Sequence, residues 1–262
     1  MQTPLTNECR SNKHYVKIDE MSLTTTLSAF LLVLANFALS ADASQEKGPR
    51  TTNDIHYRMS PVGDTQIRFP RLTAYKDIAT MNRVNAQIDE LSKEFGCPAP
   101  RGKDDWYKVF SSVEYAAKNI FSIYASANYY CGGPYATNDA NMSLTFDLRT
   151  GKKVQFAELF KSYDANKDQI LKIIFTGQLA RTEKLLAAGE KSDENFNCEQ
   201  NSDLFTLEIL RDSEYAYNFS EKGLVVQPQW PHVVEACAER VTVPYQQLKE
   251  FAAPNGILAR IL

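Results

Sequence analysis

Histidine, tryptophan and closely spaced cysteine pairs are scarce in this sequence, whose 262 residues include three His and two Trp. No two of its five cysteines form the C-x-x-C pair typical of structural zinc sites. Nucleophilic catalysis by Ser or Cys needs a histidine base held by a third group. Neither His56 nor His232 lies in a recognisable elbow such as G-x-S-x-G. We therefore predict no metal, no cofactor and no catalytic residue, and we expect the protein not to be an enzyme.

An excess of basic charge is also missing. The chain has 29 Lys and Arg against 32 Asp and Glu, a formal net charge of −3. General nucleic-acid binders normally carry a basic surplus, so we predict no nucleic-acid partner. The 11 Gly and 11 Pro are too few for a collagen-like or low-complexity chain. The composition is that of an ordinary globular protein.

No apolar run is long enough for a typical membrane span. The longest lies at Leu27–Leu39 and is short of the about 20 residues that a spanning helix needs, but it suits a secretory signal. Small residues follow it and offer cleavage after Ser40 or Ala43, of which we favour Ala43. We predict a periplasmic or secreted protein with no stable membrane span once the signal is removed.

The polar stretch Met1–Glu20 is unusual before a signal peptide, so we expect residues 1–43 to include an over-long start, with initiation at Met21. An uncleaved anchor with a short cytoplasmic tail is the alternative. Residues 44–54 are polar and contain Gly and Pro, which predicts a mobile leader.

Four cysteines remain beyond the predicted signal: Cys97, Cys131, Cys198 and Cys237. An even number in an exported chain indicates two disulfides. Three pairings are possible, and we favour Cys97–Cys131 with Cys198–Cys237 because each would link residues within one half of the chain. A metal site is the weaker interpretation, since the cysteines are far apart in sequence.

Hydrophobic periodicity predicts an α+β fold of antiparallel sheets with interspersed helices, stapled by disulfides. We divide it into an N-terminal part at 55–135 and a C-terminal part at 136–262. Helices are expected at 77–95, with Gly96 as C-cap, at 168–188, weakened or split at Gly177, and at 245–251. Strands are expected in the ranges 55–59, 65–69, 106–119, 120–131, 141–148, 153–159, 204–210, 213–220, 223–230 and 239–248.

Two groups of acidic residues were weighed as chemical sites. Asp164, Asn166 and Asp168 begin like a calcium loop, but the places for its Gly and Glu hold other residues, which favours a helix N-terminus instead. Asp139 and Asp147 are the candidates if the protein is instead an envelope glycan hydrolase. For Asp147 we prefer a role in stabilising the turn that follows it.

Aromatic residues around a Gly-Gly-Pro break carry the binding prediction. Tyr129, Tyr130 and Tyr135 flank that break, and Trp230 and His232 lie in the segment 227–232. Tyr and Trp are common at binding surfaces, although Tyr is also common in plain sheets. We take these five residues as candidate contacts for a protein or a cell-wall glycan. A secreted structural or immunogenic protein with no ligand is the remaining alternative.

Several short motifs resemble the extracytoplasmic domain of RsiV-like, lysozyme-sensing anti-sigma factors. They are the Tyr- and Gly-rich segment and strand at 124–160, the pattern at 218–230 and the pattern at 241–249; residues 67–85 are similar to the companion domain, which also precedes the catalytic domain of certain peptidoglycan deacetylases. The resemblance implies an α+β fold outside the cytoplasmic membrane and, by analogy with the anti-sigma factors, a lysozyme-like wall hydrolase as partner. It carries over no catalytic residue.

The cysteine pattern gives a direct test of this compartment. In native protein purified from its own compartment, we expect Cys97, Cys131, Cys198 and Cys237 to be unreactive to a thiol reagent until a reductant is added. Mass spectrometry of the alkylated protein measures this, and four reactive thiols before reduction would contradict export.

Overall fold

The computed structural model describes residues 54–62, 67–93, 95–97, 102–133, 138–188, 198, 204–230, 232–235 and 237–262. Residues 45–262 form one compact unit. The expected signal segment, start site and leader lie outside the described residues, apart from Asp54. Among the described residues, no helix is long and apolar enough to cross a membrane.

The chain begins with a hairpin and a helix. Strands β1 (His56–Pro61) and β2 (Arg68–Ala74) pair antiparallel, and α1 (Ile78–Ser92) follows. The carboxylate of Asp77 starts this helix by accepting hydrogen bonds from the backbone N–H groups of Ala79 and Thr80. The Asn85 side chain then fixes α1 to β2, because it both donates to and accepts from the backbone of Leu72.

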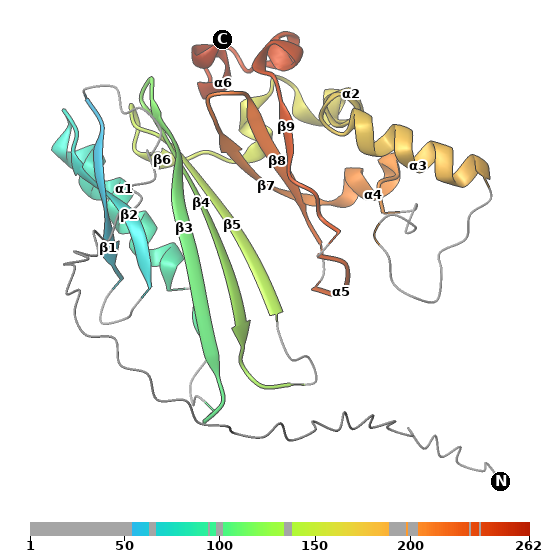
Figure 1. Cartoon of the computed structure of the whole chain (residues 1–262). Coiled ribbons are helices and arrows are strands. Elements are labelled where there is room, and N and C mark those ends of the chain that lie inside the picture. The colour runs from blue at the N-terminus through green and yellow to red at the C-terminus, as the bar shows by residue number, and fades with distance from the viewer. Residues whose placement is uncertain are drawn as a thin grey trace, which may run out of the picture. The chain divides into compact units, whose positions relative to one another are not determined.

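The central sheet has the order β3-β4-β5-β6 and is antiparallel throughout. Its strands are β3 (Trp106–Ala117), β4 (Ile120–Tyr130), β5 (Asn138–Asp147) and β6 (Lys152–Lys153). Lys118 and Asn119, both at positive φ, form the tight turn between β3 and β4, as expected for a two-residue hairpin loop. Strands β3, β4 and β5 extend well beyond β6 at the end of the sheet away from the β3–β4 turn (Figure 1).

The second half of the chain builds a smaller sheet, β7-β8-β9, with helices on one face (Figure 1). Its elements in chain order are η1 (Phe156–Leu159), α2 (Tyr163–Ile174), α3 (Thr176–Ala188), α4 (Leu207–Asp212), β7 (Glu214–Phe219), β8 (Leu224–Gln229), α5 (His232–Glu235), β9 (Val241–Val243), η2 (Tyr245–Phe251) and α6 (Ile257–Ile261).

Two apolar cores hold these layers. The first packs β1, β2 and α1 against one face of the central sheet around Phe69, Phe121 and Phe146. The second packs the helices and 3-10 turns against the small sheet around Phe175, Phe219 and Leu248. Each sheet therefore turns one face to its own apolar core.

Where the two sheets meet, a buried polar network accompanies the aromatic contact of Tyr115 with Phe219. Asn218 of β7 is almost fully buried, and its amide donates to the Ile123 carbonyl oxygen at 2.7 Å. Its Oδ1 accepts from the Ser143 hydroxyl at 2.9 Å. Beside it, the Ser122 hydroxyl accepts from the backbone N–H of Phe219 and shares a hydrogen bond with Thr145. This buried network links β7 to both β4 and β5.

Both disulfides form as expected, Cys97–Cys131 and Cys198–Cys237. The first joins the segment after α1 to the end of β4. The second joins the region before α4 to the segment after α5. The α+β class, the antiparallel sheets and the covalent staples are thus all present.

Several local predictions were wrong, each because tertiary packing outweighed the local pattern. The segment 153–159 gives only the end of β6 and then η1, since Phe156 and Leu159 turn into the second core. The segment 204–210 is not a strand but leads into α4, capped by the Thr206 hydroxyl. The long helix begins at Tyr163 and breaks at Phe175, not at Gly177.

The ends of two further elements also differ from prediction. Helix α1 ends at Ser92, four residues before Gly96. β9 is followed directly by η2, so the segment 239–248 is a strand only at its centre.

The predicted division between 135 and 136 falls between β4 and β5, which pair along their length.

The buried network at Asn218 should be needed for stability. We expect Asn218→Ala to lower the free energy of unfolding by about 1–3 kcal/mol, because it leaves the Ile123 carbonyl and the Ser143 hydroxyl without their partner. Urea denaturation followed by circular dichroism measures this. Asn128→Ala, on an exposed position of β4, is the matched control and should change stability little. If both variants lose the same free energy of unfolding, the buried network does not contribute more than an exposed side chain.

Candidate functional site

The two neighbouring tyrosines at the end of β4 lie on opposite faces of the sheet. Tyr129 stacks on Tyr107 of β3 with ring centroids 4.8 Å apart and packs against the first core. Tyr130 is paired with Trp106 across the two strands, so both side chains are on the other face. Of this predicted pair, Tyr129 has a packing role and Tyr130 is available at the surface.

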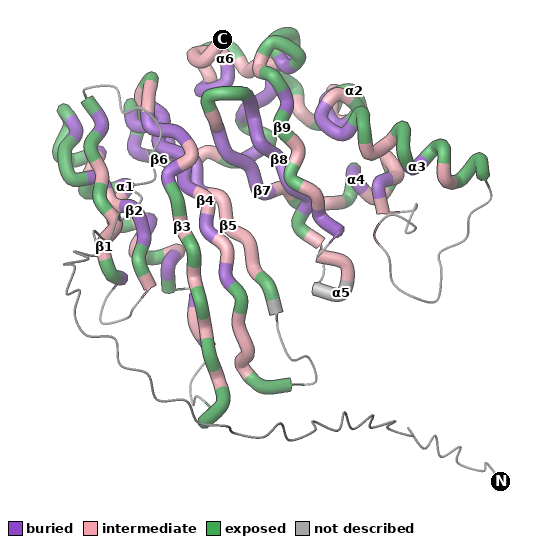
Figure 2. The backbone as a smooth tube through the Cα atoms, in the orientation of Figure 1, coloured by how far each residue is buried: buried purple, intermediate pink, exposed green. Residues whose placement is uncertain are grey.

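The surface around Tyr130 is a platform of aromatic and polar side chains. In register on three strands, alternate residues project from this side of the sheet. We call it the open face, and it consists of Trp106, Lys108, Phe110, Asn128, Tyr130 and Asp139. Figure 2 shows that the far ends of β3 and β4 are exposed or intermediate, whereas the ends near β6 are buried.

Two large apolar side chains lie exposed on the open face. Phe110 is 63% exposed and Trp106 is 37% exposed, and Lys108 holds its ammonium 5.7 Å from the Trp106 ring centroid. Asn128 donates a hydrogen bond to Asp139 on the next strand. Exposed aromatics beside polar groups that can exchange hydrogen bonds are typical of binding surfaces.

The smaller sheet and α5 border the open face on its inner side. The Arg240 guanidinium lies 3.9 Å from the centroid of the Tyr124 ring and pairs with Glu114. Next to it, the Asn141 side chain accepts from the Tyr124 hydroxyl and donates to Glu235 of α5. Gln229, in the predicted segment 227–232, lies beside β5, because its side chain donates to the Asn141 carbonyl at 3.1 Å.

The other three predicted contact residues are Trp230, His232 and Tyr135. Trp230 is partly buried against Phe205 and donates its indole N–H to the Ser213 hydroxyl, so it supports the second core. His232 begins α5, and its side chain lies outside the described atoms. Tyr135 lies outside the described residues. Only Tyr130 is placed by the structure on the open face.

Sequence reasoning missed Trp106 and Phe110. The alternation along β3 could have indicated that they are exposed. Tyr107 and Val109 belong to the packed face, so the residues next to them in sequence point outward. The beginning of this strand was predicted, but which of its faces is covered depends on contacts with β2 and α1 that are distant in sequence.

A groove separates the central sheet from β7 and the helices. Its volume is about 560 Å³ and it runs past β5, η1, the start of α2 and β7. Phe156, Tyr163 and Tyr215 form an aromatic wall, with Phe156–Tyr215 centroids 5.0 Å apart. Burial raises the pKa of the Tyr163 hydroxyl to about 12, so it stays protonated at neutral pH.

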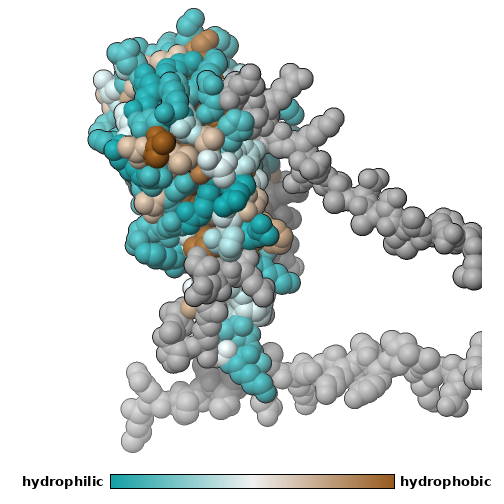
Figure 3. Space-filling view, turned by 90° about the vertical axis from the view of Figure 1, so that its left-hand side faces the viewer, coloured by the Kyte–Doolittle hydropathy of each residue, from teal (hydrophilic) through white to brown (hydrophobic). Residues whose placement is uncertain are grey.

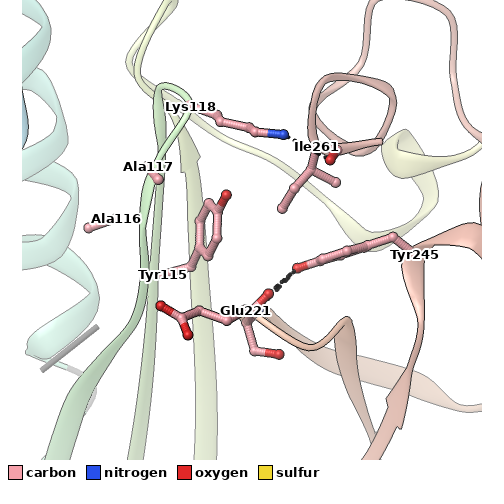
Figure 4. A pocket seen from close by; sticks show the side chains of 8 residues that line it. Tyr115, Ala116, Ala117, Lys118, Glu221, Tyr245 and Ile261 are labelled. Carbon is pink, nitrogen blue, oxygen red and sulfur yellow. Dashed lines mark hydrogen bonds between the residues drawn. The ribbon is translucent and has the colours of Figure 1, made fainter. Parts of the chain in front are cut away.

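A smaller cavity of about 310 Å³ lies beside the β3–β4 turn (Figure 4). Tyr115, Lys118 and Tyr245 line it. The polar groups of two of them are already engaged, since the Tyr245 hydroxyl donates to the Ser220 carbonyl and the Lys118 ammonium to the Ile261 carbonyl. We assign this cavity no function.

Asp147 stabilises the turn that follows it and pairs with two arginines. Its backbone carbonyl accepts from the N–H groups of Thr150 and Gly151, as expected for the turn. Its buried carboxylate accepts from Arg260 of α6 and from Arg149. Burial alone would raise the pKa of this carboxyl, but the hydrogen bonds from Arg260 and Arg149 outweigh it and hold the pKa below its ordinary 3.8.

The calcium-like segment also has a structural role. Asn166 donates to the Lys161 and Ser162 carbonyls, while Asp168 accepts two hydrogen bonds from Arg211. Within the part of the chain that the structure describes, no group of three or more His, Cys, Asp or Glu side chains could hold a metal ion.

The structure thus defines an α+β protein with two disulfides and an open aromatic surface. The face seen over α1, β1 and β2 is largely hydrophilic, with small separate hydrophobic spots (Figure 3). No family model matches the chain. No curated protein matches it.

Two solved structures are similar to this chain. One is a member of the DUF3298 family from Bacteroides fragilis NCTC 9343, with a TM-score of 0.48, 12% identity and coverage of 79% of this chain and 94% of that one. The other is a DUF3298 family protein from Pseudomonas aeruginosa PAO1, with a TM-score of 0.45, 12% identity and coverage of 77% and 93%.

The Asp147 ion cluster should make stability depend on pH. Because the native pKa is lowered, its contribution is complete above 3.8 and is lost as the pH falls through the native value. We expect Asp147→Asn to destabilise the protein at pH 7 and to flatten the acid limb of the stability curve. Thermal unfolding between pH 2 and pH 7 tests this, with Asp139→Asn, an exposed aspartate, as control; an unchanged acid limb would contradict the assignment.

Proposed function

We propose that this protein is an exported, non-catalytic binding protein of the bacterial envelope, working in the periplasm or outside the cell, and that the open face binds its partner. The observation that carries the proposal is the exposure of Phe110 and Trp106 on a strand whose other face is packed. Exposed aromatics of this kind bury much apolar area on binding and act as anchors in protein interfaces.

The two disulfides support the compartment. Such bonds persist outside the cytosol, in oxidising surroundings. They are consistent with the apolar segment at 27–39, which predicts secretion.

The favoured partner is a protein, specifically a lysozyme-like wall hydrolase. This choice comes from the motif resemblance at 124–160 and 218–249, and the open face suits it chemically. Two exposed rings lie beside one lysine and the Asn128–Asp139 pair, so that an apolar centre is flanked by polar groups able to bond a partner.

Cell-wall glycan is the second candidate. The specific observation in its favour is that amide, carboxylate and ring groups lie on one face of the sheet, where they could contact sugar hydroxyls and the apolar face of a sugar ring together. The two candidates share the surface and differ in the ligand.

The open face gives a prediction for the partner. Residues 44–262 should bind a purified animal-type lysozyme, and Phe110→Ala combined with Trp106→Ala should weaken binding at least about tenfold by removing two anchors. Isothermal titration calorimetry measures this, with unchanged circular dichroism as a requirement. Ile78→Ala, equally exposed on α1 at 67%, is the matched control.

The outcomes separate the candidates. If lysozyme does not bind but purified peptidoglycan does, and the double variant abolishes sedimentation with it, the glycan is the ligand. If the double variant binds either ligand as well as the wild type does, the open face is not the site. Release of soluble muropeptides from peptidoglycan would instead indicate a hydrolase.

A further inference from the structure

β5 has one edge that is only partly paired. β6 covers it at Phe146 and Asp147, and the backbone N–H of Val154 adds one bond to the Thr145 carbonyl. Because alternate residues of a strand point their backbone groups to the same side, Asn141 and Ser143 face this edge as Thr145 does. The Asn141 carbonyl confirms the direction, since it accepts from the Gln229 side chain at 3.1 Å.

The backbone N–H and C=O of Ser143 have no hydrogen-bond partner among the described residues, nor does the N–H of Asn141. Both residues are partly exposed to the groove rather than sealed in a core. A strand edge of this kind is a template for another strand.

β7 presents a second edge of the same kind. It is the outermost strand of the small sheet, paired on one side only with β8. The N–H of Phe219 points away from β8, to the Ser122 hydroxyl, so Tyr217 and Tyr215 also direct their backbone groups away from β8. The main-chain groups of these two tyrosines likewise have no partner in the described part of the chain.

The groove described above lies along both edges. Residues of β5 and of β7 line it, and Val154 and Gln155 lead from β6 into its end. A guest strand entering here would continue the line of β6 along β5. Among the described strands, none pairs with this edge of β5 from 138 to 144, a stretch long enough for about seven paired residues at roughly 3.4 Å each.

The charges in the groove select the chemistry of the guest. Lys153 is in register with Phe146 and so projects on the side of Met142. Lys167, whose ammonium lies 5.7 Å from the Tyr163 ring centroid, also lines the groove. Glu214 is the opposing acidic residue that lines the groove, so the lining carries a surplus of positive charge.

We propose that this groove binds an extended, acidic segment of a partner polypeptide by strand addition to β5. Backbone hydrogen bonds to the N–H and C=O of Ser143 and to the N–H of Asn141 would supply affinity. Acidic side chains near Lys153 and Lys167 would supply selectivity. This binding surface is the backbone edge of β5 and does not depend on the aromatic side chains of the open face.

The direct test uses a capped heptapeptide of alternating valine and glutamate, with a valine–lysine heptapeptide of the same length as control. In the free protein, the Ser143 amide should exchange with deuterium at least about tenfold faster than that of Leu144, which points to β4. Adding the glutamate peptide should slow exchange at Ser143 and Asn141, as measured by NMR.

A steric variant and a backbone variant make the test specific. Ala157→Trp should block the groove, because Ala157 lines it and is exposed; Ala188→Trp, exposed at the end of α3, is the matched control. N-methylation of alternate peptide amides should abolish binding by removing the donors. Three results would overturn the proposal. They are slow exchange at Ser143 in the free protein, equal binding of the lysine or methylated peptide, and binding to Ala157→Trp at wild-type strength.

The result is distinguishable from that for the open face. The Phe110→Ala and Trp106→Ala changes should leave peptide binding unchanged, because neither residue lines the groove. Loss of peptide binding in that double variant, with its fold intact, would also overturn the proposal.

Discussion

The contact on which the arrangement depends is the buried amide of Asn218. The protein has two apolar cores, each built mostly on its own sheet. Among the described residues, the central sheet adds only Tyr115, Ala117 and Ile120, near the β3–β4 turn, to the second core. Asn218 reaches from β7 to the Ile123 carbonyl and the Ser143 hydroxyl, and buried polar groups tolerate few alternative positions. Apolar packing thus supplies most of the stability of each half, while a polar junction defines their relative register.

The same junction shapes both candidate binding surfaces. β7 contacts the central sheet near Ser122 and Ser143. In the described part of the chain, the far half of that face therefore stays open, with Phe110 and Trp106 exposed on it. The edge of β5 is uncovered because the chain leaves the sheet after Lys153 to reach the second core through η1.

The sequence predicted what short-range patterns encode. Alternation located β3, β4 and β5, a helical period located α1, and the even cysteine count led to the two observed bridges. Prediction from local pattern was wrong where a segment packs against residues distant in sequence. The segment 204–210 alternates like a strand but leads into α4. The helix forms because Leu210 packs in the second core and the Thr206 hydroxyl caps its start.

The candidate site was predicted only in part for the same reason. In the segment around Tyr130, the pattern could not tell Tyr130 from Tyr129, because both faces of β4 are rich in aromatic and small residues. Trp230 looked available in sequence, but it fills a gap beside Phe205. Deciding between a packed and an exposed ring requires knowing what covers each face, which is a property of the whole fold.

The Cys97–Cys131 bridge has a consequence for recognition. It ties the end of β4 beside Tyr130, far from the β3–β4 turn, to the segment that follows α1. The loss of conformational freedom at that end of the strand is therefore incurred when the chain folds and oxidises, before any encounter. A ligand then meets rings that are already in place, so a larger share of its contact energy can appear as affinity. A reducing environment would reverse this advantage without touching a single contacting side chain.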